Sequence, residues 1–399
     1  GRASSIEELL TRGVDKIYPT REELEKVLRS GNKLKVYQGF DPTGNKLHIG
    51  HMVGLMKLRQ WQDLGHHVIF LIGDFTAMVG DPSGKYSARQ VLTHEQTLEN
   101  AKDYKNQASK ILKFNGENPA EVIFNGDWLG KLSAIEFIRI ARNLTFAQVV
   151  ERDMFQERFK RGQDVATSEF LYPVMQAYDS VEMDVDVEVG GRDQMFNMMM
   201  GRRLMKRMKN KDKFVMTTIL LENSEGKKLG KTEGNAIALT DGPSELFGAV
   251  MAFPDEVVIK CFECLTNVSI EEIEKIRKDI ENGENPIVHK KKLAFEVVKI
   301  LHSQDAAKSA QGEFEKVHQE RSNPTDAPIF DSSTLKSGAT ITDAIIAAGL
   351  ATSRAKAKQN ITQGGTVVNG ETITDPNTPF KAEPGTILKY GKHEFREIK

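Results

Sequence analysis

The 399-residue sequence has little of several features that mark whole classes of protein. It holds two cysteines, which excludes a disulfide scaffold and fits a reducing compartment. No apolar run approaches the roughly 18 residues that a membrane-spanning helix needs. Neither sign of charge dominates, since 55 Lys and Arg face 56 Asp and Glu, for a net charge of −1. A surface for nucleic acid must therefore be a local patch.

The N-terminal segment also lacks the pattern of a secretory signal. Arg2, Glu7 and Glu8 are followed by no apolar core. With the low cysteine content, this predicts a cytoplasmic protein with no membrane partner. The length suggests two or three domains, each with enough residues for a core.

The most informative stretch runs from Tyr37 to His51 and reads YQGFDPTGNKLHIGH. A short strand is predicted before it, a glycine- and proline-rich turn within it, and a helix beyond Leu47. His48 and His51 then share one face of the first helical turn. Free backbone N–H groups at a helix N-terminus suit a phosphate, and two imidazoles beside it can donate hydrogen bonds as charge develops. The alternative is a pair of surface histidines, but the preceding strand and turn favour the phosphate site.

The following segments extend this unit into an alternating α/β pattern. Residues 67–73 form a continuous apolar run, typical of a strand buried on both faces of a parallel sheet. Residues 121–124 predict a short strand, and the alternation at 184–189 predicts a half-buried one. The pattern indicates an α/β fold with a Rossmann-like parallel sheet, whose ligands bind at the carboxyl ends of the strands.

Two loops carry charged residues among turn formers. The loop at 76–89 contains Asp81, Lys85 and Arg89, and it either lines a site or is simply solvated. Its place after a buried strand favours a site. The loop at 227–232 has three lysines around a glycine, and we interpret it as an exposed, mobile loop with cationic tips.

Two helices carry polar patterns. At 167–179, Tyr172, Gln176 and Asp179 fall on one stripe of an otherwise apolar helix. Such a stripe indicates ligand contacts or an internal network, and Tyr with Asp favours ligand contacts because they suit a phenol and an amine. A second glycine turn at 190–194 opens a helix whose far end, 202–213, is strongly basic. That end is a solvated face or follows a phosphate backbone.

The chain after residue 242 is predicted to form a helical segment, a linker and a small terminal unit. Residues 243–320 read as helical throughout, and Cys261 and Cys264 lie there without a second metal-binding pair, which favours buried thiols over zinc ligands. A linker at 321–337 precedes a small unit at 338–399. Basic residues on a helix beside a glycine-rich hairpin predict an RNA-backbone platform there, or alternatively a dimerisation lobe.

In combination, these motifs resemble the class I aminoacyl-tRNA synthetases, and within them the bacterial tyrosyl-tRNA synthetases. The segment 40–51 matches the HIGH region of that family, and 228–232 matches its KMSKS loop in the K-x-G-K-T form. Segments 81–85, 172–179 and 190–194 match the tyrosine pocket and its surroundings. The terminal unit resembles an RNA-binding module shared with a small-subunit ribosomal protein, so the likeness covers nearly the whole chain.

The resemblance implies a tyrosine–tRNA ligase. Such an enzyme activates L-tyrosine with ATP to tyrosyl-adenylate and transfers tyrosine to the 3′-terminal adenosine of tRNA(Tyr). It implies a homodimer, no tightly bound cofactor, no metal site in the protein, and ATP as a substrate with Mg²⁺. It also implies four segments: a catalytic domain at 1–242, a helical anticodon-region domain at 243–320, the linker at 321–337, and an RNA-binding α+β domain at 338–399.

The resemblance also assigns the site residues. Those for tyrosine are Tyr37, Asp81, Tyr172, Gln176, Asp179 and Gln194. Those for catalysis are His48, His51, Lys228, Lys231 and Thr232. Those for ATP are Gly39, Asp41, His48, Gly50, His51, Gly191, Asp193 and Lys231. Those for RNA are Arg354, Lys356 and Lys358. Because the substrate carboxylate attacks, no side-chain nucleophile is required, and catalysis rests on positioning and electrostatics.

Three rival functions differ in what they would use. A tryptophanyl-tRNA synthetase would need an acceptor for an indole N–H, whereas Tyr37 and Asp179 suit a phenol. A small-molecule nucleotidylyltransferase would have no use for the helical and RNA-binding units. A non-catalytic RNA-binding protein would have no use for His48, His51 and Lys231 together.

Overall fold

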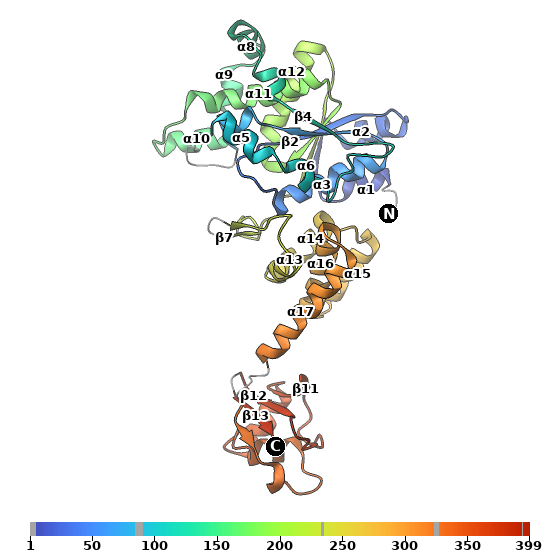
Figure 1. The fold of residues 1–399 in the computed structure, drawn as a ribbon, viewed down its shortest axis with the longest axis vertical. Coiled ribbons are helices and arrows are strands. Elements are labelled where there is room, and N and C mark those ends of the chain that lie inside the picture. The colour runs from blue at the N-terminus through green and yellow to red at the C-terminus, as the bar shows by residue number, and fades with distance from the viewer. Residues whose placement is uncertain (1–4, 84–90, 233–234, 323–326, 393) are drawn as a thin grey trace. The chain divides into compact units, whose positions relative to one another are not determined.

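The computed structural model divides into two compact units, residues 1–310 and 311–399. It describes residues 5–83, 91–232, 235–322, 327–392 and 394–399, with the backbone alone at 231–232, 235 and 319–322. The first unit thus spans the predicted catalytic domain and most of the predicted helical segment (Figure 1). Among the described residues, no helix has both the length and the apolar character to cross a membrane.

The first unit is built on a six-stranded sheet surrounded by helices. Its sheet strands are β1 Val14–Tyr18, β2 Lys35–Phe40, β3 His67–Ile72, β4 Glu121–Phe124, β5 Val187–Gly191 and β6 Phe214–Thr218. Two short strands, β7 Lys231–Thr232 and β8 Asn235–Ala236, form a separate ribbon. The helices up to β6 are α1 Ile6–Thr11, α2 Arg21–Arg29, α3 Ile49–Asp63, α4 Thr76–Val79, α5 His94–Ala101, α6 Tyr104–Ala108, α7 Gly126–Leu129, α8 Ala134–Ala141, α9 Phe146–Val150, α10 Asp153–Lys160, α11 Thr167–Met183, η1 Arg192–Gln194 and α12 Met195–Lys209.

The strand order is β1-β6-β5-β2-β3-β4, and only β1 runs antiparallel to its neighbour. The five parallel strands therefore follow the doubly wound order in which the chain first builds outward from β2 and then returns to its other side. The predicted fold class is confirmed. The order reverses between β2 and β5, and ligands of such sheets bind at the carboxyl ends of the strands at this point.

Strand β2, in the middle of the sheet, packs against helices on both of its faces. In β2, Tyr37 faces α11 and α12, in one cluster with Ile69 and Leu71 of β3. Gln38 and Phe40 point to the opposite face, where Gln38 meets Gly54 of α3 and Phe40 contacts His51 of the same helix. Alternate residues of β2 thus contact the helices on opposite faces of the sheet, and the polar side chains among them can contact a bound ligand.

The prediction of a half-buried strand at 184–189 is wrong. The strand is β5, Val187–Gly191, and its Val187, Glu188 and Val189 are all buried because it lies between β2 and β6. Asp184 belongs instead to the end of α11, where it adopts the left-handed conformation with φ 51°. The alternation of acidic and apolar residues therefore gave no indication that the Glu188 carboxylate is buried.

The helices after the sheet confirm the predicted helical region. They are α13 Pro243–Met251, η2 Asp255–Val257, α14 Val258–Leu265, α15 Ile270–Glu281, α16 Pro286–Leu301 and α17 Gln304–Ser322. Cys261 and Cys264 of α14 are buried free thiols, as expected. Burial raises the pKa of both, that of Cys264 to about 12.

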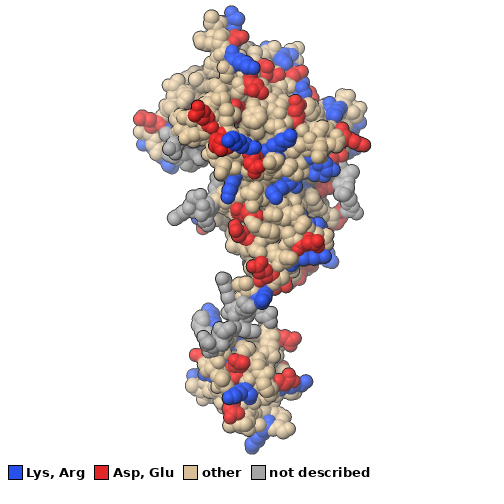
Figure 2. All heavy atoms as spheres, viewed as in Figure 1, with Lys and Arg blue, Asp and Glu red and all other residues tan. Residues whose placement is uncertain are grey.

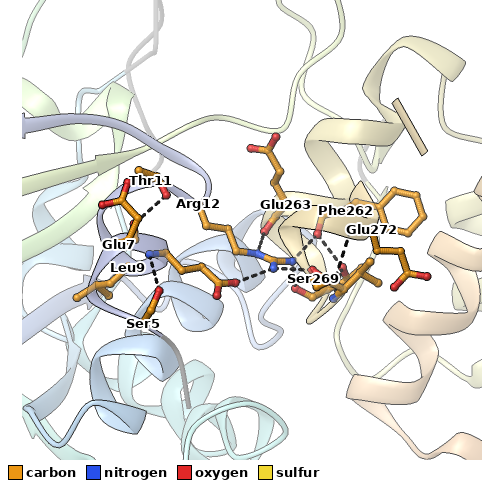
Figure 3. Close-up of polar contacts among 12 residues, drawn as sticks. Ser5, Glu7, Leu9, Thr11, Arg12, Phe262, Glu263, Ser269 and Glu272 are labelled. Carbon is orange, nitrogen blue, oxygen red and sulfur yellow. Dashed lines mark hydrogen bonds and ion pairs between the residues drawn. The ribbon is translucent and has the colours of Figure 1, made fainter. Parts of the chain in front are cut away.

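Arg12, between α1 and β1, ties these helices to the sheet (Figure 3). Its guanidinium donates to four backbone carbonyls at or after the end of α14, those of Phe262 at 2.9 Å, Glu263 at 2.8 Å, Thr266 at 2.6 Å and Val268 at 2.6 Å. A planar guanidinium with five donors suits such a set of acceptors. Beside it, Lys57 of α3 donates to the Leu9 carbonyl at 2.9 Å. Two buried basic side chains thus join α1, α3 and α14.

The second unit contains a five-stranded sheet in the order β11-β10-β12-β13-β9, and its described residues include the helices α18 and α19. Its elements are β9 Ile329–Phe330, η3 Ser332–Thr334, α18 Ile341–Ala347, α19 Arg354–Thr362, β10 Thr366–Val368, β11 Glu371–Ile373, β12 Ile387–Tyr390 and β13 Glu394–Ile398. Residues 329–334 of the predicted linker thus belong to this unit. The predicted hairpin is confirmed, and Asn369 and Gly370 form its turn with φ of 48° and 86°.

Candidate active site

A cavity of about 340 Å³ opens at the carboxyl ends of β2 and β5, where the strand order reverses. The predicted site residues that line it are Tyr37, Gly39, Asp41, His48, Gly50, His51, Asp81, Tyr172, Gln176, Asp179, Gly191, Asp193, Gln194 and Lys228. The side chains of Lys231 and Thr232 lie outside the described residues, as do Lys85 and Arg89. The structure therefore brings together residues spread over some 190 positions of the sequence. They meet because the carboxyl ends of the parallel strands lie at the same edge of a Rossmann-like sheet.

One wall of the cavity combines a tyrosine hydroxyl with a carboxylate. The Tyr37 hydroxyl lies 2.7 Å from Ser180 Oγ. Asp179 accepts hydrogen bonds from Trp128 Nε1 at 2.9 Å and Asn125 Nδ2 at 3.2 Å. Burial raises the pKa of Asp179 well above its ordinary value, and these two bonds oppose the shift. Burial, followed by the charges of Glu188 and Asp179, also raises the pKa of Tyr37. These groups suit a hydroxyl that both donates and accepts, such as a phenol.

A second wall is held by two carboxylates. Asp41 accepts from the Tyr172 hydroxyl at 2.5 Å and from Thr76 Oγ1 at 2.6 Å. Asp81 accepts from Gln194 Nε2 at 2.6 Å. Tyr172 has its pKa raised by burial and then by the charge of Asp41. The stripe on α11 thus faces the cavity, where Tyr172 pairs with Asp41 after β2 and Gln176 with Glu188 of β5.

The two histidines stand at the start of α3 with their rings stacked, 3.7 Å between centroids. His48 Nδ1 accepts from the Gly50 N–H at 3.1 Å, and His51 Nδ1 accepts from the His48 N–H at 3.0 Å. Because Nδ1 is the acceptor in each ring, the neutral imidazoles carry their protons on Nε2. Both can therefore donate from Nε2.

The expectation of free backbone N–H groups at this helix start is wrong. The Ile49 N–H donates to the Ile237 carbonyl at 2.9 Å, the Gly50 N–H to His48 Nδ1, and the His51 N–H to the His48 carbonyl at 2.9 Å. The described first turn therefore offers an anion its imidazoles and its dipole, while its first three backbone donors are already used.

The lysine loop lies beside the start of the same helix. The Leu229 N–H donates to the Leu221 carbonyl at 2.8 Å, and the Leu239 N–H donates to the Leu47 carbonyl at 3.0 Å. Gly230 lies between with φ +71°, and a Cβ there would come within 3.0 Å of Ile49. Lys228 is exposed, with Nζ 3.7 Å from Asp193 Oδ2. The loop thus holds one described cation beside the cavity.

Two family models match adjoining parts of the chain. The family described as tRNA synthetases class I (W and Y) matches residues 29–319, and the tyrosine–tRNA ligase SYY-like C-terminal domain matches 322–396. The tyrosine–tRNA ligase of Thermotoga maritima is 42% identical over 392 residues, covering 98% of this chain and 96% of that protein. That of Aquifex aeolicus is 41% identical over 378 residues, covering 94% of each.

The chain belongs to the class I tRNA synthetases (W and Y), among the tyrosine–tRNA ligases. Solved structures with a similar fold are also named tyrosyl-tRNA synthetases. A C-terminally truncated mitochondrial tyrosyl-tRNA synthetase of Coccidioides posadasii matches with a TM-score of 0.64 at 26% identity, covering 78% of this chain and 92% of that one. The Archaeoglobus fulgidus tyrosyl-tRNA synthetase complexed with L-tyrosine shares the fold, with a TM-score of 0.60 at 22% identity, covering 77% and 100%.

Several polar residues around the cavity escaped the sequence analysis. They are Gln38, Asn125, Ser180, Glu188 and Lys213. Asn125 directly follows β4 and could have been found as a strand-end residue. Lys213 gave no signal, because it lies in a run of basic residues.

The basic run at 202–213 was predicted to be a solvated face or to follow a phosphate backbone, and its lysines differ in their surroundings. Lys209 and Lys211 lie 3.4 Å from Asp184 Oδ1, and Lys211 also lies 2.9 Å from Asp186 Oδ1. Figure 2 likewise shows acidic and basic side chains interspersed on the visible face, with no extended area of one sign among the coloured atoms. Lys213, however, is fully buried, so neither a solvated face nor a phosphate contact describes it.

Proposed function

We propose that this tyrosine–tRNA ligase carries out both of its steps with the residues of the cavity. A carboxylate oxygen of L-tyrosine attacks the α-phosphorus of ATP, and the bond to pyrophosphate breaks, which gives tyrosyl-adenylate. The terminal ribose hydroxyl of tRNA(Tyr) then attacks the acyl carbon, and AMP leaves. The observation that supports this most strongly is the pairing of Tyr37 with Asp179 in the same cavity as His48 and His51.

Tyrosine would bind across the two polar walls. Tyr37 and Asp179 would hold the phenol, and Tyr172, Gln176 and Asp81 the α-amine, with Gln194 on the tyrosyl side of the adenylate. All six residues line the cavity, and Tyr172, Gln176 and Asp179 come from one face of α11. Because Tyr37, Tyr172 and Asp179 are buried, a ligand that leaves their polar groups unpaired would bind poorly.

ATP would lie over the glycine turns and the start of α3. Gly39, Gly50 and Gly191 leave room for close approach, while Asp41 and Asp193 face the nucleotide. His48 and His51 would donate from Nε2 to the phosphate as charge develops, joined by Lys228, Lys231 and Thr232 on the pyrophosphate. Mg²⁺ would arrive with ATP and supply further positive charge to its phosphates.

The second unit would bind the tRNA backbone through α19. Lys356 and Lys358 are exposed, and Arg354 is exposed but lies 2.6 Å from Asp343. Lysines on one short helix beside the β10–β11 hairpin suit phosphate contacts that position RNA without reading its sequence.

The chain would act as a cytoplasmic homodimer. Both cysteines are buried free thiols, in keeping with a reducing compartment. Four large apolar side chains on the α8–α10 segment are exposed, namely Ile135 at 63%, Ile138 at 58%, Phe146 at 69% and Phe159 at 45%. Such a concentration on one segment is unusual for a monomer and suits a self-complementary interface.

Amino-acid-dependent ATP–pyrophosphate exchange tests the proposal. With each of the standard amino acids offered in turn, exchange should occur with tyrosine and be negligible with phenylalanine or tryptophan. Charging of tRNA should then follow with tyrosine alone. Exchange that depends equally on phenylalanine would contradict the phenol assignment.

A further inference from the structure

A buried ion pair, Lys213–Glu188, adjoins the cavity, and neither of its members has a part in the chemistry proposed above. Lys213, just before β6, is 0% exposed, and Glu188 of β5 is 2% exposed. Lys213 Nζ lies 2.5 Å from Glu188 Oε2. Taking both charges out of water is expensive, and an apolar pair of similar volume is often as stable. The pair's other contacts therefore indicate what it does.

Glu188 fixes the orientation of the Gln176 amide. Its Oε1 accepts from Gln176 Nε2 at 3.0 Å. An ionised carboxylate only accepts hydrogen bonds, so the NH₂ end of the amide must face Glu188 and the carbonyl end must face away. Gln176 Oε1 is buried and has no hydrogen-bond partner among the described residues. Since Gln176 lines the cavity, this acceptor is available to a donor on the ligand, such as an ammonium group.

Lys213 acts on the other end of the site. Its Nζ donates to Ser180 Oγ at 2.9 Å, and Ser180 Oγ lies 2.7 Å from the Tyr37 hydroxyl. An ammonium group has donors only, so it occupies one acceptor position of Ser180. The serine hydroxyl is thereby held between Lys213 and Tyr37, and the Tyr37 oxygen is held in the cavity wall.

We propose that Lys213 and Glu188 are positioning residues of the tyrosine site, which hold Gln176 with its carbonyl toward the α-amine and hold Tyr37 through Ser180. One ion pair then sets the geometry at both the amine and the phenol ends of the substrate. This inference rests on the proposed function, because it assumes that tyrosine occupies the cavity.

Two ligands that differ only in the amine separate positioning from stability. L-tyrosine carries the α-amine, and 3-(4-hydroxyphenyl)propionate lacks it. In Glu188→Gln, the amide of residue 188 can donate as well as accept, so Gln176 is no longer held in one orientation. We expect tyrosine to bind roughly 10- to 100-fold more weakly, as for one hydrogen bond to a charged group, and the amine-free analogue to bind as before.

The double variant Lys213→Gln/Glu188→Gln keeps the measurement possible if the single variant folds poorly, because it removes both buried charges. It should show the same loss for tyrosine relative to the analogue. A matched control is Glu169→Gln, which breaks another buried ion pair, Arg158–Glu169 at 2.6 Å, away from the cavity lining. It should lower stability without changing the ratio of the two affinities.

Calorimetric titration measures the affinities of both ligands for wild type and the three variants. If the ratio of the tyrosine affinity to the analogue affinity stays at the wild-type value in both the single and the double variant, the positioning role is overturned. This includes the result in which both ligands bind more weakly by the same factor. If wild type shows no tyrosine-dependent exchange, the proposed function itself fails, and that result is distinct from either of these.

Discussion

At the scale of single residues, the two histidines illustrate how one side chain can serve the fold and the reaction at once. His48 caps α3 through Nδ1 and is thereby left with Nε2 as its donor. His51 has the same arrangement, because its Nδ1 accepts the His48 N–H. The backbone thus selects the tautomer that a phosphate needs.

The first prediction concerns these donors. His48→Ala and Lys231→Ala should each lower kcat for adenylate formation by roughly 10²–10³, as for one lost donor to a developing anion, because their contacts strengthen only in the transition state. Tyrosine affinity should be almost unchanged. Single-turnover rates and equilibrium binding measure the two quantities separately.

His67→Ala is a matched control for this prediction. That imidazole pairs with Glu121 at 2.9 Å, near the opposite ends of the strands from the cavity. Its removal should leave adenylate formation unaffected. Weaker tyrosine binding in His48→Ala, with an unchanged single-turnover rate, would contradict the assigned role.

At the scale of elements, the sequence predicted several elements because local signals agreed with the final contacts. The strand at 121–124 has the predicted bounds, and the hairpin of the second unit carries its own turn chemistry at Asn369 and Gly370. The failures share one cause. Burial in the centre of a sheet depends on partners distant in sequence, so the strand β5 was predicted to be half-buried and the basic run ending at Lys213 to be solvated or bound to phosphate.

The junction of α1, α3 and α14 gives a prediction with a definite pH dependence. Burial lowers the pKa of Lys57 from 10.5 to about 7, with Arg12 adding to the shift and Cys264 and Glu8 opposing it. Between these values the unfolded chain holds a proton that the native state has lost, so the free energy of unfolding rises with pH in that window.

Lys57→Met removes this titration. Relative to the variant, wild type should gain roughly 3–5 kcal/mol of stability between pH 7 and pH 10.5, the amount that such a pKa difference corresponds to. Urea unfolding at several pH values measures the difference. Lys26→Met, on the exposed side of α2, is the control and should give a constant difference. A pH-independent gap for Lys57→Met would contradict the buried, titrating lysine.

At the scale of the whole molecule, the two units should divide the labour. The cavity lies entirely within residues 1–310, so a chain ending at Ser322 should form tyrosyl-adenylate at close to the full-length rate. It should charge tRNA poorly, because it lacks Arg354, Lys356 and Lys358. Loss of about three phosphate contacts should reduce the slope of log affinity against log salt by roughly 2–3. Equal charging by the shortened chain would show that the second unit does not bind the RNA.

Assembly is a second property of the whole molecule. If the exposed apolar residues of α8–α10 form a self-complementary interface, sedimentation should find a dimer at micromolar concentration. Ile138→Glu with Phe146→Glu should dissociate it, since charges would be buried on both sides of the two-fold axis. A monomeric wild-type protein under these conditions would contradict the interface.

The central claim is that Tyr37 and Asp179 recognise a phenol in the cavity, and the ratio of kcat/KM for tyrosine to that for phenylalanine measures it most directly. Wild type should discriminate by about 10⁴–10⁵, a magnitude for which tyrosyl-tRNA synthetases are themselves the standard example. In Tyr37→Phe and Asp179→Asn, the ratio should fall by at least roughly tenfold, because the phenol loses a buried partner. A ratio that stays at the wild-type value in both variants would show that the phenol is recognised elsewhere.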